Sequence, residues 1–401
     1  MEADMKIFRE KSIAIKILQQ DIAIPAVVQN KADIALRRIE GKSRETVVHR
    51  GSGFRKGIWA AAAALVTLGT VACAAAVIHW SSGMEAKLNV TQEQKAFLEK
   101  QGITTSVGKS VSREGVTVTA QQSIVDARFA HLSFRVDGYE VREGSILRPD
   151  FEYAMVSVDG VDCDVLSGGF YHNMHITDKE RVYTDGTPIA ERSDGSLVER
   201  YMNEDGSMEY VISLMIDNKD NSLVGKPIRV TLQNLGTYVR YSSAFRKDVE
   251  ASWMLDFTLE GSDKARSFVL SESLGDSGAT VTKAEISPIS IYVEYDFPMQ
   301  TIEREGIDEN GNWGMTASYA NAPCLTGVRL KDGTYLPRIV GGSTEGYMSD
   351  DRDTYTAYGA TNHVIHPEEV DALLFVKYIP DSLDETVEIP PEEQYYIVTL
   401  E

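Results

Sequence analysis

The sequence predicts a mainly β protein with a short helical cytoplasmic tail, one transmembrane helix, and an extracellular region of two immunoglobulin-like or similar β-sandwich domains. Three observations support this fold class. Residues 57–80 carry no charged side chain, the net charge changes sign across this stretch, and apolar residues beyond it alternate with a period of two between Gly and Asp turns. The predicted organisation is a docking segment (1–56), a transmembrane helix (57–80), a stalk with a short helix (81–114), a membrane-near β-sandwich domain (115–265) and a second, smaller β-domain (266–401).

Composition limits the classes of partner. The chain has 401 residues, of which 43% are hydrophobic and 25% are charged, and these values are ordinary for folded protein. Residues 1–56 hold 12 basic and 7 acidic side chains, whereas the residues after 80 hold 28 basic and 53 acidic ones. The overall charge of −20 would repel a polyphosphate, so we expect no nucleic-acid partner.

The uncharged stretch has the length of a membrane span. As a helix its 24 residues would rise about 36 Å, enough to cross a hydrocarbon layer of about 30 Å. Trp59 and Trp80 lie near its ends, where indole rings prefer the membrane interface. Nine of the 24 residues are Ala, so the hydrophobic drive is modest, and a buried soluble helix, a cleaved signal peptide or a lipidated Cys73 are the weaker alternatives.

The basic residues precede the predicted span, and this asymmetry predicts its orientation. Lys and Arg concentrate on the cytoplasmic side of membrane helices. We therefore expect a single-pass protein of the cell membrane, with the N-terminus in the cytoplasm and the C-terminal region extracellular.

The cytoplasmic segment is too short for a large core, so we expect it to work by binding a partner. Pro25 suits the first position of a helix, and Gly41 suits the position after its end. The apolar stripe of this helix is formed by Val28, Ala32, Leu36 (or Ala35 in its place) and Ile39. Such a stripe would bind another protein or, as the alternative, the surface of the lipid bilayer.

The residues at the two ends of segment 91–102 predict a second helix. Thr91 stands at the N-cap with Gln94 three residues later, which is the pattern of a capping box, and Gly102 follows the last turn.

Alternating segments predict the strands that follow. "GVTVTAQQSIV" and "FAHLSFRV" predict a hairpin, and "EYAMVSVDGVDCDV", "LVERYMNEDGSMEYVISLMI" and "GVRLKDGTYLPRIVG" each carry an Asp-Gly turn. A break near "SLGDSGA" separates two sets of strands. "HPEEVDALLFV" predicts one or two helical turns before a final strand, "QYYIVTL".

Two motifs are similar to known sites of chemistry. The "GDSG" tetrad at 275–278 matches the surroundings of a trypsin-type nucleophile, but no matching His motif accompanies it, so we interpret it as a turn. Acidic turns such as "DENGNW" lack the spacing of a calcium-binding EF-hand. The sequence therefore predicts no catalytic residues and no cofactor, and the protein is expected not to be an enzyme.

Histidine and cysteine residues leave two questions open. Two His-x-x-His pairs, His172 with His175 and His363 with His366, would bind zinc if they met, but residues three apart in a strand point to opposite faces, so we predict no metal site. Cys163 and Cys324 would form a disulfide only if the fold brought them together.

The order of these segments resembles a known family. "DIAIPAVVQNKADIALRRIE", an apolar span and "GKSVSREGVTVTAQQSIVDARFAHLSFRVDG" are similar to the domain-of-unknown-function family 4179. These are single-pass membrane proteins of Gram-positive bacteria that are often encoded beside extracytoplasmic-function sigma factors. The resemblance covers about residues 20 to 260, and it implies that the cytoplasmic segment acts like an anti-sigma factor. It implies no catalytic residues.

Two functions follow from the sequence. The first is a single-pass membrane regulator, anti-sigma-factor-like, with an extracellular β-rich region that senses or binds an unknown ligand or protein and a cytoplasmic helix that binds a sigma factor. The alternative is a surface-displayed β-sandwich protein with a binding or structural role and no part in signalling.

Overall fold

The structure of the protein, a computed structural model, describes residues 78–141, 147–163, 165–176, 181–216, 222–239, 244–307, 313–347, 353–377 and 391–400. The chain divides into two compact units, Met1–Ala75 and Ala76–Glu401. The first unit, with the predicted cytoplasmic segment and most of the predicted span, lies outside the described residues. Within the described ranges, no helix combines the length and the apolar character that crossing a membrane requires.

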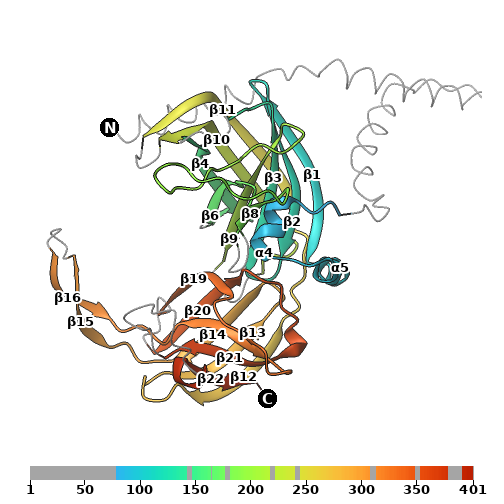
Figure 1. Ribbon diagram of the computed structural model, residues 1–401. Helices are drawn as coiled ribbons and strands as arrows, with labels where there is room; N and C mark the ends of the chain where they lie inside the picture. The colour runs from blue at the N-terminus through green and yellow to red at the C-terminus, as the bar shows by residue number, and fades with distance from the viewer. Residues whose placement is uncertain are drawn as a thin grey trace, which may run out of the picture. The chain divides into compact units, whose positions relative to one another are not determined.

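Two helices, α4 (Ser82–Leu88) and α5 (Gln92–Gln101), begin the described part (Figure 1). The capping box predicted for α5 is confirmed. The Thr91 hydroxyl accepts from the Gln94 amide, and the Gln94 side chain accepts from the Thr91 amide. Gly102 ends α5 with a φ of 72°, a left-handed conformation that glycine adopts without strain.

The segment predicted as a stalk with a short helix holds α4, α5 and the strand β1 (Thr104–Arg113). Met84, Leu88 and Leu98 of the two helices are buried together with Ile124 from the neighbouring sheet. Because these apolar side chains are covered, the segment contributes two helices and an edge strand to the packed fold.

The first sandwich consists of two antiparallel sheets (Figure 1). One sheet has the order β1-β2-β3-β9-β6, with β2 (Val116–Val125), β3 (Phe129–Asp137), β9 (Met208–Met215) and β6 (Val165–Phe170) beside β1. The other has the order β11-β10-β4-β5, from β11 (Phe245–Thr258), β10 (Pro227–Val239), β4 (Leu147–Val158) and β5 (Val161–Cys163). A small hairpin, β7 (Met174–Ile176) with β8 (Arg181–Tyr183), lies between β6 and β9 in the sequence.

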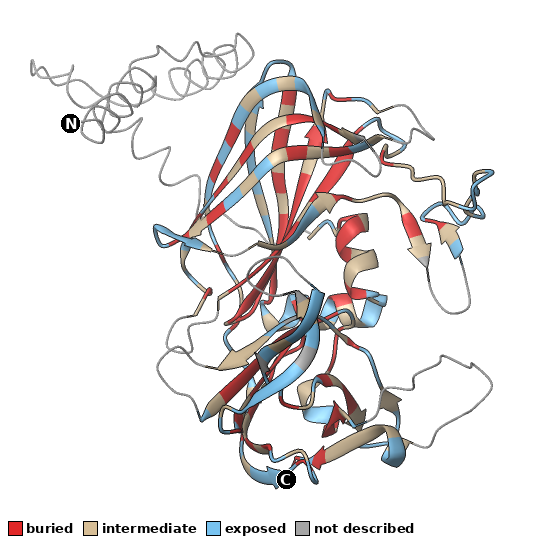
Figure 2. Cartoon of the chain, turned by 90° about the vertical axis from the view of Figure 1, so that its left-hand side faces the viewer, coloured by how far each residue is buried: buried red, intermediate tan, exposed pale blue. Residues whose placement is uncertain are grey.

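The core of this sandwich comes from alternate residues of both sheets. Val118, Phe134 and Ile212 of one sheet are buried in the same apolar cluster as Val230 and Trp253 of the other. Figure 2 shows buried residues alternating with half-buried and exposed ones along these strands. The predicted hairpin of "GVTVTAQQSIV" with "FAHLSFRV" is confirmed as the antiparallel pair β2–β3.

One acid lies at the margin of this core. Burial raises the pKa of Asp150 to about 6, although the amide of Phe151 and the hydroxyl of Tyr210 donate to its carboxylate and act in the opposite direction. The pKa of Asp150 is therefore higher in the folded state than in the unfolded chain. Its contribution to stability is most favourable below about pH 4 and falls as the pH rises to about 6.

Replacing this acid by its neutral isostere tests that effect. The substitution Asp150→Asn is expected to change the free energy of unfolding more favourably at pH 7 than at pH 4, by about 1 to 2 kcal/mol. The reason is that the amide needs no proton to remain uncharged when buried. Urea unfolding of the full chain at both pH values measures the difference. Asp162→Asn, at an exposed position on β5, is the control. An equal response of the two variants would contradict the assignment.

The second sandwich repeats the architecture. One sheet has the order β12-β13-β14-β20-β19, from β12 (Arg266–Ser273), β13 (Thr280–Ile286), β14 (Ser290–Asp296), β20 (Thr354–Thr361) and β19 (Val340–Tyr347). The other has the order β18-β17-β21-β22, from β18 (Tyr335–Leu336), β17 (Leu325–Leu330), β21 (Val370–Val376) and β22 (Tyr395–Thr399). Val293 and Tyr295 of the first sheet share a buried cluster with Val328, Leu373 and Phe375 of the second.

The prediction of helical turns in "HPEEVDALLFV" is wrong for most of its length. Only Pro367–Glu369 forms a single 3₁₀ turn, and Val370–Val376 is the buried central strand β21. A continuous apolar run fits a buried strand as well as a helix, and neighbouring strands on both sides decide for the strand here. A further short helix, α6 (Pro391–Gln394), precedes β22, the predicted final strand.

A two-stranded ribbon extends from the second sandwich. Strands β15 (Thr301–Ile307) and β16 (Trp313–Tyr319) form a sheet of their own. Trp313, Met315 and Tyr319 are 71%, 63% and 54% exposed. The ribbon thus presents large apolar side chains to solvent, and such side chains more often lie in cores or interfaces.

Polar contacts join the two sandwiches. Asp126, between β2 and β3, accepts hydrogen bonds from the hydroxyls of Ser287 and Ser290 at the β13–β14 turn. The guanidinium of Arg128 lies 2.6 Å from a carboxylate oxygen of Glu285 and 4.1 Å from the centre of the Tyr292 ring. We call this set of contacts the joint.

Candidate functional site

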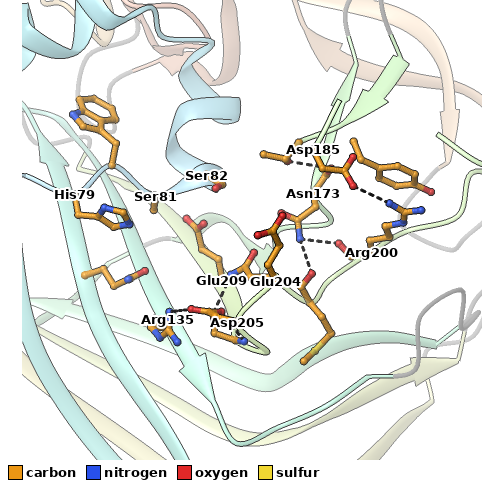
Figure 3. Close-up of a pocket in the computed structure, with 17 residues that line it drawn as sticks. His79, Ser81, Ser82, Arg135, Asn173, Asp185, Arg200, Glu204, Asp205 and Glu209 are labelled. Atoms are coloured by element: carbon orange, nitrogen blue, oxygen red, sulfur yellow. Dashed lines mark hydrogen bonds and ion pairs between the residues drawn. The ribbon is translucent and has the colours of Figure 1, made fainter. Parts of the chain in front are cut away.

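A cavity of about 760 Å³ lies where the chain enters the first sandwich (Figure 3). We call it the junction cavity, and its volume is in the range of small-molecule sites. The wall is formed by His79–Ser82, by Gln121 of β2 and Arg135 of β3, by residues 173 and 183–185, and by residues between 200 and 209. The cavity therefore borders directly on the residues that end the predicted span.

A buried carboxylate holds the start of α4 against this wall. Glu209 of β9 accepts a hydrogen bond of 2.8 Å from the amide of Gly83 and another of 2.8 Å from the hydroxyl of Ser133. Burial raises the pKa of Glu209, and the hydrogen bonds act against that rise. A Cβ atom at Gly83 would lie 2.6 Å from the Glu209 carboxylate, so glycine is what allows the helix to approach the sheet this closely.

A β-bulge in β2 orients Gln122, which makes the second polar contact with the start of α4. The register of the β2–β3 pairing shifts between Ala120 and Gln122, so that the Gln122 side chain faces the helix instead of the sandwich core. The Gln122 side chain accepts from the amide of Ser81 over 3.1 Å and donates to the hydroxyl of Thr104 over 2.9 Å. These bonds fix the position of the residues immediately before α4.

More polar side chains lie under α4 on the same face of the sheet. His131 is buried, its Nδ1 lies 2.9 Å from the Ser213 hydroxyl, and its Nε2 has no hydrogen-bond partner. Burial, and to a smaller extent the charge of Lys87, lower the pKa of His131 to about 3. The ring is therefore neutral at physiological pH, and the helix lies on a face that combines polar contacts with the apolar contacts of Met84 and Leu88.

Three tight turns of one design precede β9, and two of them contribute to the wall. Asp185, Asp194 and Asp205 each precede a Gly and each accept from the amide and the hydroxyl of the Thr or Ser two residues later. The glycines have φ values of 80°, 79° and 81°. Glycine tolerates this left-handed conformation, which closes a three-residue hairpin loop.

Two arginines are held in the wall by the acids of these turns. The guanidinium of Arg135 binds Asp205 over 2.6 Å and also binds Asp137. Hydrogen bonds from Ser207, followed by the bond from Arg135, lower the pKa of Asp205. The guanidinium of Arg200 lies 3.8 Å from the centre of the Tyr183 ring and 3.4 Å from Asp185. Figure 3 shows both arginines beside their acids. The positive charges of the wall are thus already compensated.

The predicted partner-binding residues Val28, Ala32, Leu36 and Ile39 lie outside the described residues. Trp80, predicted at a membrane interface, packs beside α4 and α5, and its indole donates to Glu99 over 2.9 Å. The tetrad at 275–278 is a turn between β12 and β13, in which the Ser277 hydroxyl accepts from the amide of Ala279.

The histidine pairs have separate surroundings. His363 lies 3.0 Å from the side chain of Asn89, and the ring of His366 packs against Phe97 with 4.1 Å between the ring centres. His172 instead accepts from the amide of Met174 in the first sandwich. No group of three or more His, Cys, Asp or Glu able to hold a metal ion occurs among the described residues.

Cys163 and Cys324, the cysteines of the two β regions, do not form a disulfide with each other. Cys163 is half-buried at the end of β5, whereas Cys324 is exposed beside β17. Although part of the residue is exposed, desolvation of the thiol, followed by the nearby charge of Glu345, raises the pKa of Cys324, which makes its thiol less reactive at neutral pH.

Sequence reasoning missed the junction cavity. The "TDGT", "SDGS" and "EDGS" repeats were visible at 184–187, 193–196 and 204–207 and could have indicated a set of similar turns. Glu209 gave no such indication, because it stands alone in an apolar strand and its partner Gly83 is 126 residues away.

Comparisons with known proteins add little. No protein-family model matches the chain, and no curated protein matches it. One solved structure, titled the crystal structure of the conserved domain protein from Bacillus anthracis, is similar over 75% of this chain and 91% of that chain. Its sequence identity is 11% and its TM-score is 0.35, values that carry no argument for fold or function.

Proposed function

We propose that the protein is a single-pass membrane regulator, anti-sigma-factor-like, whose extracellular β region senses a ligand and whose cytoplasmic helix binds an extracytoplasmic-function sigma factor. The observation that supports this proposal best is the position of the junction cavity. Its wall includes His79, Trp80, Ser81 and Ser82, the residues that end or directly follow the predicted span. A ligand in the cavity would therefore contact the segment that connects the sensing region to the membrane.

The structure also offers a way for that contact to act on the span. The start of α4 is held by the Glu209 carboxylate and the Gln122 side chain, both of which belong to the sheet beside the cavity. A ligand that binds more tightly to one position of α4 shifts the population toward that position. The proposed signal is such a shift, passed to the predicted span through the residues before α4.

The cytoplasmic part of the proposal has a direct test. Leu36→Asp places a charge in the predicted apolar stripe and is expected to reduce co-purification of the sigma factor encoded beside the gene at least about tenfold, since burying an unpaired carboxylate in an interface is costly. Quantitative pull-down with the full chain in detergent measures the effect.

A matched control lies on the opposite face of the same predicted helix. Asn30→Asp introduces the same charge about half a turn away from the stripe and should leave binding unchanged. If the unmodified chain recovers no sigma factor, or if both variants bind equally well, the regulator is not supported.

One observation favours the alternative of a surface-displayed binding protein. The β15–β16 ribbon exposes Trp313, Met315 and Tyr319, which are residue types enriched in interfaces. A chain that binds an extracellular partner through this ribbon and recovers no sigma factor would fit the alternative.

A further inference from the structure

The β15–β16 ribbon has two free strand edges. In the described part of the chain, β15 and β16 pair with each other and with no third strand. Figure 1 shows the ribbon extending away from the second sandwich. The outer edge of each strand therefore presents backbone amides and carbonyls that a further strand can bind. A two-stranded ribbon alone is only marginally stable in water, so a third strand would also stabilise it.

One face of the ribbon carries a row of large apolar side chains. Trp313, Met315 and Tyr319 are separated by two and four residues along β16, so their side chains lie on the same face of the ribbon. Each of the three is more than half exposed. The row is long enough to contact several side chains of a partner, and Trp, Met and Tyr are residue types enriched at the centres of interfaces.

The same face carries an acidic row along β15. Glu303 lies opposite Ala317, and Glu305 lies opposite Met315. Directly opposite residues share a face, so the two carboxylates lie beside the apolar row. Both glutamates are exposed, and neither takes part in an ion pair within the described part of the chain. A partner of this face must therefore meet an apolar row and two carboxylates that lack a cation.

We propose that β15 binds an extended segment of another protein in which Lys or Arg stands at every second position. The segment adds to the ribbon as a third strand, and its backbone bonds to the free edge of β15. Its alternate side chains lie beside Glu303 and Glu305, where cross-strand pairs of opposite charge stabilise the sheet. The apolar stems of these side chains extend toward Met315 and Trp313, whose indole face attracts a cation. This inference goes beyond the proposed regulator and does not depend on it.

Charge disfavours the other occupants of the ribbon. The residues after 80 hold 28 basic and 53 acidic side chains, so a second copy of this region would be repelled. Pairing of β15 with β15 of another copy would also bring the glutamates of the two copies close together, which is destabilising. A surface of anionic lipids would meet the same repulsion. The apolar row alone does not select a partner, whereas the acidic row selects a basic one.

A short synthetic peptide that alternates lysine and valine is the probe for this proposal. Fluorescence anisotropy of the labelled peptide, titrated with the full chain in a non-ionic detergent at constant ionic strength, is expected to show saturable binding. The double variant Glu303→Gln with Glu305→Gln is expected to weaken the binding about fivefold, because two cross-strand charge pairs are lost. Trp313→Ala is expected to weaken it as well. All three residues are exposed, so both variants should fold normally.

Matched variants separate the ribbon from the rest of the acidic surface. Glu260→Gln with Glu272→Gln removes two exposed carboxylates elsewhere, and Val269→Ala shortens an apolar side chain that is 93% exposed on β12. Both controls should leave the affinity unchanged. Absence of saturable binding, equal weakening by the ribbon variants and their controls, or equal binding of a glutamate–valine peptide would overturn the proposal.

Two further outcomes are decisive. Self-association of the chain that is lost in Trp313→Ala would overturn the proposal, because a second copy would then occupy the ribbon. The readout of the titration is peptide binding alone. Lysine–valine peptide binding by a chain that recovers no sigma factor would therefore support the ribbon site and refute the regulator.

Discussion

Trp253→Ala is expected to lower the free energy of unfolding by about 3 to 5 kcal/mol, the range for removing a large aromatic side chain from a core. Trp253 is completely buried, and its ring centre lies 5.6 Å from that of Phe151 in an edge-to-face arrangement. Its indole also donates to the carbonyl of Val116 over 3.1 Å, a bond that joins β11 to β2 across the sandwich. The substitution thus leaves a cavity and an unpaired carbonyl between the two sheets.

The chain offers a matched control for this substitution. Trp313 is 71% exposed on the β15–β16 ribbon, so Trp313→Ala is expected to change stability by less than about 0.5 kcal/mol. Urea unfolding of both variants, followed by circular dichroism, compares the two effects. Equal losses would mean that the ribbon is packed against another part of the protein or that Trp253 is not in a core. A loss of 3 to 5 kcal/mol would be a large fraction of the stability of an ordinary domain, which is about 5 to 15 kcal/mol.

Asp126→Ala is expected to cost a similar amount, about 3 to 5 kcal/mol, because one carboxylate satisfies four buried donors. Asp126 is 2% exposed. It accepts from the amides of Arg128 and Phe129 over 2.8 and 2.7 Å and from the hydroxyls of Ser287 and Ser290. Alanine removes the acceptor of the two amides, and it leaves the hydroxyls of Ser287 and Ser290, which belong to the other sandwich and lie 3.1 Å apart, only each other as partners.

Loss of the joint should also be visible in how the chain unfolds. With the joint intact we expect the two sandwiches to unfold together, whereas Asp126→Ala should separate the urea transition into two. Asp263→Ala is the control, because Asp263 lies beside the joint but is exposed. A single unshifted transition for Asp126→Ala would show that the apolar contacts of Phe129, Met215 and Tyr292 are enough to hold the joint.

Features that depend on neighbouring residues in the sequence could be predicted. The α5 helix follows from Thr91, Gln94 and Gly102, which are all local. The turn at Asp159–Gly160 is confirmed, since both residues have positive φ values, 53° and 80°, as the tightest hairpin turn requires. Period-two alternation likewise predicted the strands of the mainly β fold.

The candidate site depended on distant residues and could not be predicted. A single bulge at Ala120 and Gln122 reverses which side chains of β2 face the core. The alternation of apolar and polar residues in the sequence does not predict where such a bulge occurs. Glu209 appears in the sequence as an isolated polar residue in a buried strand. Only the folded chain shows that it meets the start of α4.

The Asp-Gly turns also bear on how the protein ages. Asp-Gly sequences are the usual places where a chain converts to isoaspartate, because the glycine nitrogen attacks the aspartyl carboxyl carbon to close a five-membered ring. Here the amides of Gly186, Gly195, Gly206 and Gly333 donate to the carbonyl three residues earlier, over 2.8, 2.9, 3.0 and 2.9 Å. The aspartyl oxygens are held by the amide two residues later. With both reacting groups bound elsewhere, the geometry protects these four sites from chemical decay for as long as the turns stay folded.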